Sequence, residues 1–336
     1  MIKVGIVGYG LSGRYLQAPF FHSNPDFDLK YIATSQEINT SLFPETKAVK
    51  NIDDLIDDVE IDLISLCTPS HTHFEYGQKS LQAGKHVLIE KPVTATLKEA
   101  ETLFQLAKSK GLHLFVYQNR RFDSDFLTVK KVIDSGILGE ILSYEAHFDR
   151  YKPLLNPKKW KEVVSPANGI LYDLGSHLID QSVVLFGKPS QISGKVFTQR
   201  EGSEIDDAFD IFLDFEKIKV TLKSSLMVKN QGPKYVVHGT KGSFVKYGID
   251  VQEEHLVSGK WPLSEGFGKE SKDFDGSIVT NISGLEFSGK IETLNGQWSL
   301  LFENIANVIL RGEEKFFNDN EILTQFEIIE KIKGIK

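Results

Sequence analysis

The sequence has little cysteine, no long apolar run and no excess of positive charge. Cys67 is the one cysteine among 336 residues, so no disulfide can form within the chain, as is usual in a reducing compartment. No apolar stretch approaches the ~20 residues that a membrane-spanning helix needs. The formal net charge is −7 and no basic stripe with interleaved aromatic residues occurs, which excludes nucleic acid as an expected partner. We therefore expect a cytoplasmic protein that binds neither membrane nor nucleic acid.

Metal ligands are also sparse. His71 and His73 lie close together, but no third and fourth ligand follows at a suitable spacing, so no metal site is expected. Internal repeats and low-complexity tracts are absent from the sequence.

Short apolar runs alternate with helical stretches in the first third of the chain. The expected strands are Ile2–Val7, Leu29–Ala33, Asp62–Cys67, His86–Ile89 and Leu112–Tyr117. Residues 52–59 and 97–110 have helical patterns between them. Continuous apolar strands separated by helices are typical of a parallel sheet that is covered on both faces. The pattern predicts an α/β, doubly wound Rossmann domain over residues 1–120.

After residue 120 the apolar positions recur at every second residue. The expected strands are 142–148, 209–215, 217–227, 234–238 and 243–247, the expected helices are 169–186 and 321–333, and 258–280 is expected to be a loop. Period-two alternation indicates half-buried strands of an antiparallel sheet. We therefore expect a second, α+β domain over residues 121–336 with a large, mainly antiparallel open sheet, serving substrate binding and oligomerisation.

The segment Gly8-Tyr9-Gly10-Leu11-Ser12-Gly13 fits the pattern G-x-G-x-x-G directly after the first strand. In this context Gly8 permits a tight turn, Gly10 lets the backbone approach a pyrophosphate, and Gly13 allows close packing of helix on strand. The motif predicts a dinucleotide-binding site, with Leu11 and Ser12 among its contacts. The alternative is a glycine-rich turn without a ligand.

The end of the second strand, Ala33-Thr34-Ser35-Gln36, carries no carboxylate at the place where NAD-binding proteins use one for the ribose hydroxyls. This favours NADP, with Ser35 as a contact. No arginine follows to bind a 2′-phosphate and Glu37 lies close by, so NAD stays possible.

Two further segments carry side chains suited to proton transfer. Asp173 and His177 are four residues apart in a helical stretch, which places both on one helix face. A carboxylate beside an imidazole orients it and tunes its pKa, although such pairs also occur as surface or capping contacts. Glu90-Lys91-Pro92 closes a parallel strand at the edge where ligands bind, or forms an ordinary solvated loop.

These segments together resemble the Gfo/Idh/MocA oxidoreductase family over nearly the whole chain. The resemblance rests on Gly8–Gly13, Cys67-Thr68-Pro69-Ser70-x-x-His73, Ala83–Pro92, Asn119–Asp123 and Asn168–His177. The residues around 120–126 and 172–180 are most similar to the bacterial NADP-dependent scyllo-inositol dehydrogenase branch. Ser70 stands where many members have Asn, and Asn168 stands where many have Gly.

The resemblance implies roles for individual residues. Lys91 would hydrogen-bond the reacting hydroxyl, His177 would act as general base, and Asp173 would hold the substrate and the histidine. The Lys91–Pro92 bond would be cis. Thr68, Pro69, Ser70 and His73 would line the cofactor. The resemblance also implies cofactor contacts at Glu90, Lys91, Asn119 and Arg120. It implies substrate contacts at Lys91, Tyr172, Asp173 and His177. Arg120, Arg150 and Trp160 are expected either to reach the substrate or cofactor or to serve in ion pairing or packing.

The expected activity is hydride transfer between a nicotinamide cofactor and a secondary alcohol or ketone of a cyclic polyol or sugar. Two alternatives stay open: NAD-dependent glycosidase chemistry, and a non-catalytic NADP-binding regulator. The second domain has few helices to cover its sheet, and Phe212 points away from the face formed by Phe209, Ile211, Leu213 and Phe215. We therefore expect a homodimer or homotetramer that uses this sheet, the alternative being that the loop 258–280 covers the face of a monomer.

Overall fold

The computed structural model describes residues 1–39, 41–158 and 162–335 and divides the chain into two compact units. Unit 1 comprises Met1–Asn119, Gln252–Phe267 and Gln297–Asp319, and unit 2 comprises Arg120–Val251, Gly268–Gly296 and Asn320–Lys336. The first boundary lies within one residue of the expected one. The structure differs from the expected continuous second domain because two later segments of the chain pack into unit 1.

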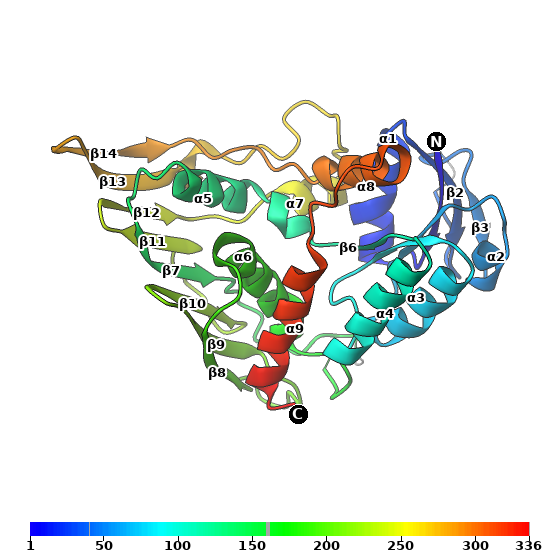
Figure 1. The fold of residues 1–336 in the computed structure, drawn as a ribbon, viewed down its shortest axis with the longest axis horizontal. Coiled ribbons are helices and arrows are strands. Elements are labelled where there is room, and N and C mark those ends of the chain that lie inside the picture. Colours follow the sequence, from blue (N-terminus) through cyan, green and yellow to red (C-terminus); the bar gives the residue numbers. More distant parts are fainter. Residues whose placement is uncertain (40, 159–161, 336) are drawn as a thin grey trace. The chain divides into compact units, whose positions relative to one another are not determined.

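Unit 1 contains a parallel sheet with the strand order β3-β2-β1-β4-β5-β6 (Figure 1). Its strands are β1 (Ile2–Val7), β2 (Phe27–Ala33), β3 (Lys47–Val49), β4 (Leu63–Leu66), β5 (His86–Ile89) and β6 (Leu114–Val116). The strand order reverses between β1 and β4, and ligands of such sheets bind at the carboxyl edge of this switch point. The expected doubly wound α/β sheet is confirmed.

The helical elements of unit 1 include two late segments of the chain. They are η1 (Ser12–Gln17), α1 (Ala18–Ser23), α2 (Asp53–Ile56), η2 (Ser70–Thr72), α3 (His73–Gln82), α4 (Leu97–Ser109), α7 (Gln252–Val257) and α8 (Ser299–Arg311). In α8 the Phe302 ring stacks on Phe20 with centroids 4.8 Å apart and meets the Phe21 ring edge-on at 4.9 Å. These aromatic contacts explain why α8 belongs to unit 1 although it lies near the end of the sequence.

Unit 2 contains a sheet with the order β14-β13-β12-β11-β7-β10-β9-β8, antiparallel except for the parallel pair β7–β10. Its strands are β7 (Ile141–His147), β8 (Gln191–Phe197), β9 (Ala208–Phe215), β10 (Ile218–Ser225), β11 (Tyr235–Gly239), β12 (Gly242–Lys246), β13 (Gly276–Ile282) and β14 (Leu285–Ile291). The expected mainly antiparallel open sheet is confirmed. The expected loop 258–280 is corrected in part, because β13 begins at Gly276.

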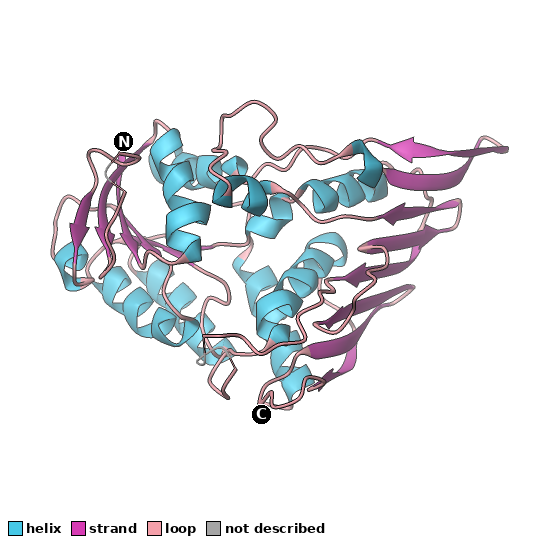
Figure 2. Ribbon diagram, turned by 180° about the vertical axis from the view of Figure 1, so that it is seen from behind, coloured by secondary structure: helices cyan, strands magenta, loops and turns pink. Residues whose placement is uncertain are grey.

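Helices cover one face of this sheet. Figure 2 shows α5 (Ser124–Asp134), α6 (Ser176–Phe186) and α9 (Asp319–Lys333) on the same face, and among the described residues no helix lies on the other face. In β9 the side chains of Phe209, Ile211 and Leu213 are buried beneath these helices, while Phe212 is 47% exposed. The alternation expected for 209–215 is thereby confirmed.

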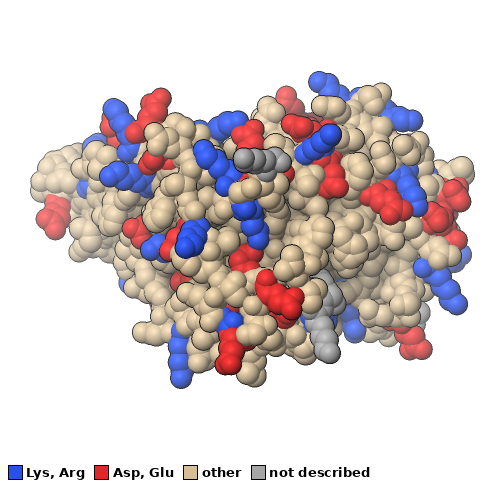
Figure 3. Space-filling view, turned by 90° about the horizontal axis from the view of Figure 1, so that it is seen from below, with Lys and Arg blue, Asp and Glu red and all other residues tan. Residues whose placement is uncertain are grey.

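Two properties of the described residues bear on the choice of partner. None of their helices combines the length and the apolar character that crossing a bilayer requires. On the face shown in Figure 3, Lys and Arg side chains are interspersed with Asp and Glu, without a continuous basic stripe.

Candidate active site

Three glycines with different surroundings form the turn after β1. The Gly8 amide donates to the Ala33 carbonyl at 2.9 Å, and Gly8 has a φ of +96°, which L side chains rarely adopt. A Cβ on Gly13 would lie 2.0 Å from the Gly8 carbonyl oxygen, so η1 packs directly on the turn. A Cβ on Gly10 would meet no atom within 4 Å. The turn is closed on the protein side and open at Gly10, which fits the close approach of a pyrophosphate.

Glu90, which follows β5, links the glycine turn to the segment that carries Lys91. Its carboxylate accepts hydrogen bonds from the Ser12 hydroxyl and, at 2.9 Å, from the Gln17 amide. The other end of the Gln17 side chain accepts from the Ser65 hydroxyl at 2.5 Å. Burial raises the pKa of Glu90, and the bonds from Ser12 and Gln17 oppose the shift. Ser12 and Glu90, both expected to contact a cofactor, therefore also position each other.

The Lys91–Pro92 peptide bond is cis, as the resemblance implied. The Pro92 carbonyl lies 2.9 Å from Nδ1 of His73, and the Thr68 carbonyl lies 2.8 Å from Nε2 of the same ring. Burial lowers the pKa of His73, while the two carbonyl oxygens favour the protonated ring. Since protein oxygens take up both ring nitrogens, His73 ties the end of β4 to the Lys91 segment.

The other cofactor contacts expected in unit 1 differ in exposure. Leu11, Ser35 and Pro69 are exposed, Thr68, Ser70 and Lys91 are half-buried, and Asn119 is buried. The Thr68 hydroxyl lies 2.7 Å from the Thr72 hydroxyl, which in turn donates to the Pro69 carbonyl. These residues follow β1, β2, β4, β5 and β6, whose carboxyl ends share one edge of the sheet.

In unit 2, Asp206 fixes the start of the π-helical segment η5 (Leu171–Gly175). The amide of Leu171 donates to the Asp206 carboxylate and the amide of Ile170 to the Asp206 carbonyl, both at 2.9 Å. A Cβ on Gly169, whose φ is +106°, would lie 2.2 Å from the same carboxylate. Sequence reasoning missed Asp206, because nothing in its local pattern distinguishes it from other loop carboxylates.

Asp173 and His177 lie on either side of the junction between η5 and α6. Asp173 belongs to the π-helical segment and is exposed, whereas His177 lies in the first turn of α6 and is buried. Tyr172, an expected substrate contact, is buried with the Lys333 ammonium 5.6 Å from its ring centroid, and burial raises its pKa to about 12. Single π turns inside helices occur frequently at functional sites, and here one carries Asp173.

Buried polar side chains hold α6 in place. Arg121 forms two hydrogen bonds of 2.7 Å with Asp180 of α6 and a third, of 2.6 Å, with Glu321. Gln181 donates to the Arg120 carbonyl at 2.9 Å and accepts from the Tyr235 hydroxyl at the same distance. A bidentate pair of this kind restricts rotation of the helix, and with it the direction of His177.

Arg120 occupies a buried ionic cluster of unit 2. Its guanidinium lies 3.1 Å from the Asp123 carboxylate and 5.1 Å from the centroid of the Phe148 ring. Close by, Lys234 and Asp125 form an ion pair at 2.5 Å. Burial, followed by the charge of Asp250, raises the pKa of Asp123 to about 8. Arg120 thus has the ion-pairing role that the sequence left open, and its cofactor contact stays a prediction.

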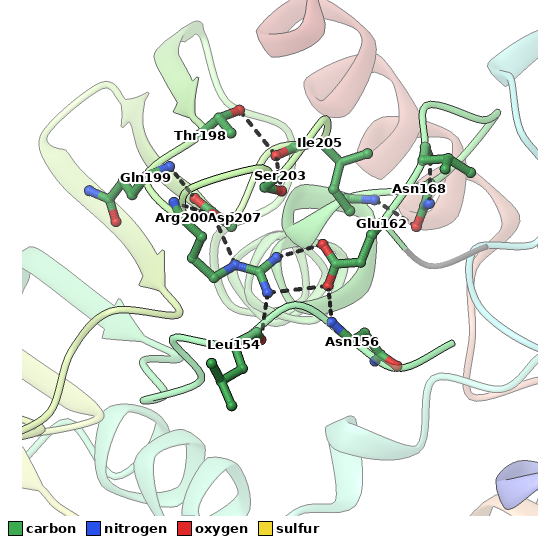
Figure 4. A network of polar contacts seen from close by, with 12 residues as sticks. Leu154, Asn156, Glu162, Asn168, Thr198, Gln199, Arg200, Ser203, Ile205 and Asp207 are labelled. Carbon is green, nitrogen blue, oxygen red and sulfur yellow. Dashed lines mark hydrogen bonds and ion pairs between the residues drawn. The ribbon is translucent and has the colours of Figure 1, made fainter. Parts of the chain in front are cut away.

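A second ion-pair network fixes part of the segment that leads to η5 (Figure 4). Arg200 contacts Asp207 at 3.0 Å and Glu162 at 2.9 Å, and donates to the Leu154 carbonyl at 3.2 Å. Glu162 also accepts from the Asn156 amide at 2.7 Å. Sequence reasoning found none of these pairs, since their members are up to 46 residues apart.

Two remaining expectations concern Trp160 and metal binding. Trp160 lies outside the described residues. Within the described part of the chain, no group of three or more His, Cys, Asp or Glu side chains is arranged to hold a metal ion.

Comparison with known proteins relates both units to one group of enzymes. Residues 2–118 match the oxidoreductase family with an NAD-binding Rossmann fold, and residues 126–245 match the GFO/IDH/MocA C-terminal domain. The chain is 39% identical over 331 residues to the scyllo-inositol 2-dehydrogenase (NADP(+)) IolW of Bacillus subtilis, covering 98% of this chain and 92% of the relative. It is 36% identical to the uncharacterized oxidoreductase YdgJ of Escherichia coli over 98% and 94% of the two chains.

Solved structures agree with this relationship. The oxidoreductase yvaA of Bacillus subtilis superposes with a TM-score of 0.96 at 38% identity, over 99% of this chain and 95% of that one. An oxidoreductase of Bacteroides fragilis gives 0.91 at 38% identity, over 100% and 97%. Both units of the fold and the sequence motifs are therefore explained by one relationship: the chain belongs to the Gfo/Idh/MocA family of oxidoreductases.

Proposed function

We propose that this protein is an NADP-preferring dehydrogenase that oxidises a secondary alcohol of a cyclic polyol or sugar, or reduces the corresponding ketone. The observation that carries the proposal is the glycine turn that is closed at Gly8 and Gly13 and open at Gly10. The substrate class is supported by the 39% identical relative that is a scyllo-inositol 2-dehydrogenase (NADP(+)).

The residues that would hold the dinucleotide follow the strands of unit 1. Gly8, Gly10 and Gly13 would receive the pyrophosphate, and the exposed Ser35 would lie at the adenosine ribose. The nicotinamide supplies a hydride acceptor for oxidation and a hydride donor for reduction. Glu90 and His73 hold the surrounding loops in place: Glu90 accepts a hydrogen bond from Ser12, and the His73 ring contacts the Pro92 carbonyl.

Lys91, Asp173 and His177 would act on the substrate. The Lys91 ammonium would donate a hydrogen bond to the reacting hydroxyl oxygen and stabilise the negative charge that develops as the proton leaves. His177 would accept that proton at a ring nitrogen, and would return it during reduction. Asp173 would accept a hydrogen bond from the substrate and orient His177. The burial of His177 and the exposure of Asp173 suit a base that is shielded from water beside a substrate-binding carboxylate.

We also propose that the uncovered face of the unit 2 sheet binds a second copy of the chain. The register places Phe212, Thr221, Glu145, Val236 and Val245 in one row across five neighbouring strands on this face. The apolar residues of the row lie among charged neighbours, a mixture that suits a self-complementary twofold contact.

A substrate screen tests the proposed activity. The purified protein is mixed with inositol isomers and aldoses in the presence of NADP⁺ or NAD⁺, and reduced cofactor is followed by absorbance. Net formation of NADPH with one of these substrates is the expected result. Release of an aglycone without net reduction would instead indicate glycosidase chemistry. Binding of NADPH without turnover on any polyol or sugar would indicate a regulator.

A further inference from the structure

An arginine packs on Tyr9, which follows the glycine that pairs with the end of β2. In the β1–β2 pair Val7 lies opposite Ala33, and the Gly8 amide donates to the Ala33 carbonyl at 2.9 Å. Tyr9 therefore lies beside the start of the loop that contains Thr34 and Ser35. Burial fixes the Tyr9 side chain, which is 3% exposed.

The Tyr9 ring contacts Arg14, which η1 carries. The Arg14 amide donates to the Gly10 carbonyl at 3.0 Å, so the residue lies one helical turn beyond the open glycine. Its guanidinium carbon is 5.9 Å from the centroid of the Tyr9 ring and 5.0 Å from that of Tyr15. Two aromatic rings thus hold the cation in place.

The loop that follows β2 lies near the hydroxyl end of the Tyr9 side chain. Burial raises the pKa of Tyr9, and both the Arg14 charge and the backbone of Asn39 oppose this shift. The backbone of Asn39 therefore lies near the Tyr9 hydroxyl. In that loop the Thr34 side chain accepts from the Gln36 amide at 3.0 Å, while the Ser35 side chain is exposed.

Arg14 itself is exposed, and within the described residues no carboxylate lies at ion-pair distance from its guanidinium. In contrast, Arg121, Arg200 and Arg311 are each paired with at least one carboxylate. A guanidinium that has no acidic partner and packs on two aromatic rings is suited to a planar, bidentate contact with a phosphate.

We propose that Arg14 recognises the 2′-phosphate of NADP, with the Ser35 hydroxyl as a second donor. The proposal rests on the cofactor preference proposed above. No cation directly follows β2 in the sequence, and Arg14, which follows the glycine turn, would supply it.

Calorimetric titration with two nucleotide fragments tests the assignment without turnover. Adenosine 2′,5′-bisphosphate carries the phosphate in question and AMP does not. The proteins are the wild type, Arg14→Gln, Arg14→Lys and, as a control that removes one exposed arginine charge elsewhere in unit 1, Arg311→Gln. Thermal unfolding of each variant verifies that it is folded.

Arg14→Gln should weaken binding of the bisphosphate by about 10- to 100-fold, the range for a charged hydrogen bond, and leave AMP binding unchanged. Arg14→Lys should give an intermediate loss of bisphosphate affinity, because lysine keeps the positive charge but cannot donate two parallel hydrogen bonds as a guanidinium does. Arg311→Gln should change neither titration.

The outcomes separate the two proposals. If the wild type binds the bisphosphate no more tightly than AMP, the proposed NADP preference is wrong. If the wild type prefers the bisphosphate and Arg14→Gln keeps that preference, only the role of Arg14 is refuted. Equal losses for both fragments would show that Arg14 supports the turn without recognising the phosphate.

Discussion

Several side chains that the sequence suggests as cofactor contacts are themselves held by buried protein groups. The two ring nitrogens of His73 lie against the carbonyl oxygens of Thr68 and Pro92, and the Glu90 carboxylate accepts from Ser12 and Gln17. Because these bonds cross between segments up to 78 residues apart, their function at the residue scale is to fix the loops that follow β1, β4 and β5.

His177 gives the most direct residue-scale prediction. His177→Ala should lower kcat by about 10²–10⁴-fold, because the substrate proton loses its acceptor, while the Kd for NADPH stays close to that of the wild type. Steady-state kinetics and fluorescence titration measure the two quantities. His22, which is exposed on α1 in unit 1, supplies the control variant His22→Ala. Wild-type turnover in His177→Ala would remove this residue from the mechanism.

The glycine turn allows a paired prediction. Gly10→Ala should leave the melting temperature unchanged, because its methyl group meets no protein atom within 4 Å, but should weaken NADPH binding by more than tenfold, which is more than about 1.4 kcal/mol. Gly13→Ala should also lower the free energy of unfolding, by about 1–3 kcal/mol, because its Cβ would overlap the Gly8 carbonyl. Fluorescence titration and thermal unfolding distinguish the two effects. Unimpaired NADPH binding by Gly10→Ala would contradict the proposed pyrophosphate site.

The residues of the motifs could be predicted, but their contacts could not. Short sequence patterns identify Gly8–Gly13, Lys91, Asp173 and His177, since each pattern is continuous along the chain. Asp206, Arg200 and Glu162 have no such pattern, because their partners come from distant segments. The role proposed for Arg14 was not expected from the sequence, because a phosphate-binding arginine usually follows the second strand rather than the glycine turn.

At the scale of elements, the strength of the local pattern determines what could be predicted. The bounds of β1 and β5 agree to the residue with those expected from the sequence, since both are short runs of mostly apolar residues. In contrast, β14 was not expected, although Leu285, Phe287 and Ile291 alternate with polar residues; most residues of this edge strand are exposed. The sequence pattern also did not predict helices α5 and α8. The residues of α8 lie in the range expected for the second domain, whereas the structure places them in unit 1.

The Arg200 network carries an element-scale prediction. Arg200→Met should reduce the free energy of unfolding by about 3 kcal/mol, because it leaves the buried Asp207 carboxylate without its cation. Arg311→Met breaks an exposed pair with Asp26 and should cost less than about 1 kcal/mol. Urea unfolding followed by fluorescence compares the two. Equal losses would show that the Arg200 pairs do not hold the segment that precedes η5.

At the scale of the whole molecule, the uncovered face of the unit 2 sheet leads to a prediction about the oligomeric state. The wild type should have a mass of two or four times 37.8 kDa by light scattering at micromolar concentration. Phe212→Asp should lower that mass to a single chain, because it places a charge on the face proposed to bind a second copy. Leu310, an exposed apolar residue of α8, supplies the control Leu310→Asp. A wild-type mass near 37.8 kDa would defeat the proposal.

The three-part composition of unit 1 also has a consequence for synthesis. A ribosome releases β1 to β6 first, but Phe302, which packs against Phe20 and Phe21, is added almost two hundred residues after β6. The Phe20 and Phe21 rings therefore lack their contact with Phe302 while most of unit 2 is synthesised. Domains that are continuous in sequence can fold one after another as they emerge. Here the nascent unit 1 cannot complete its core before the final tenth of the chain is translated, so a fragment that ends after Asn119 would expose those rings and be prone to aggregate.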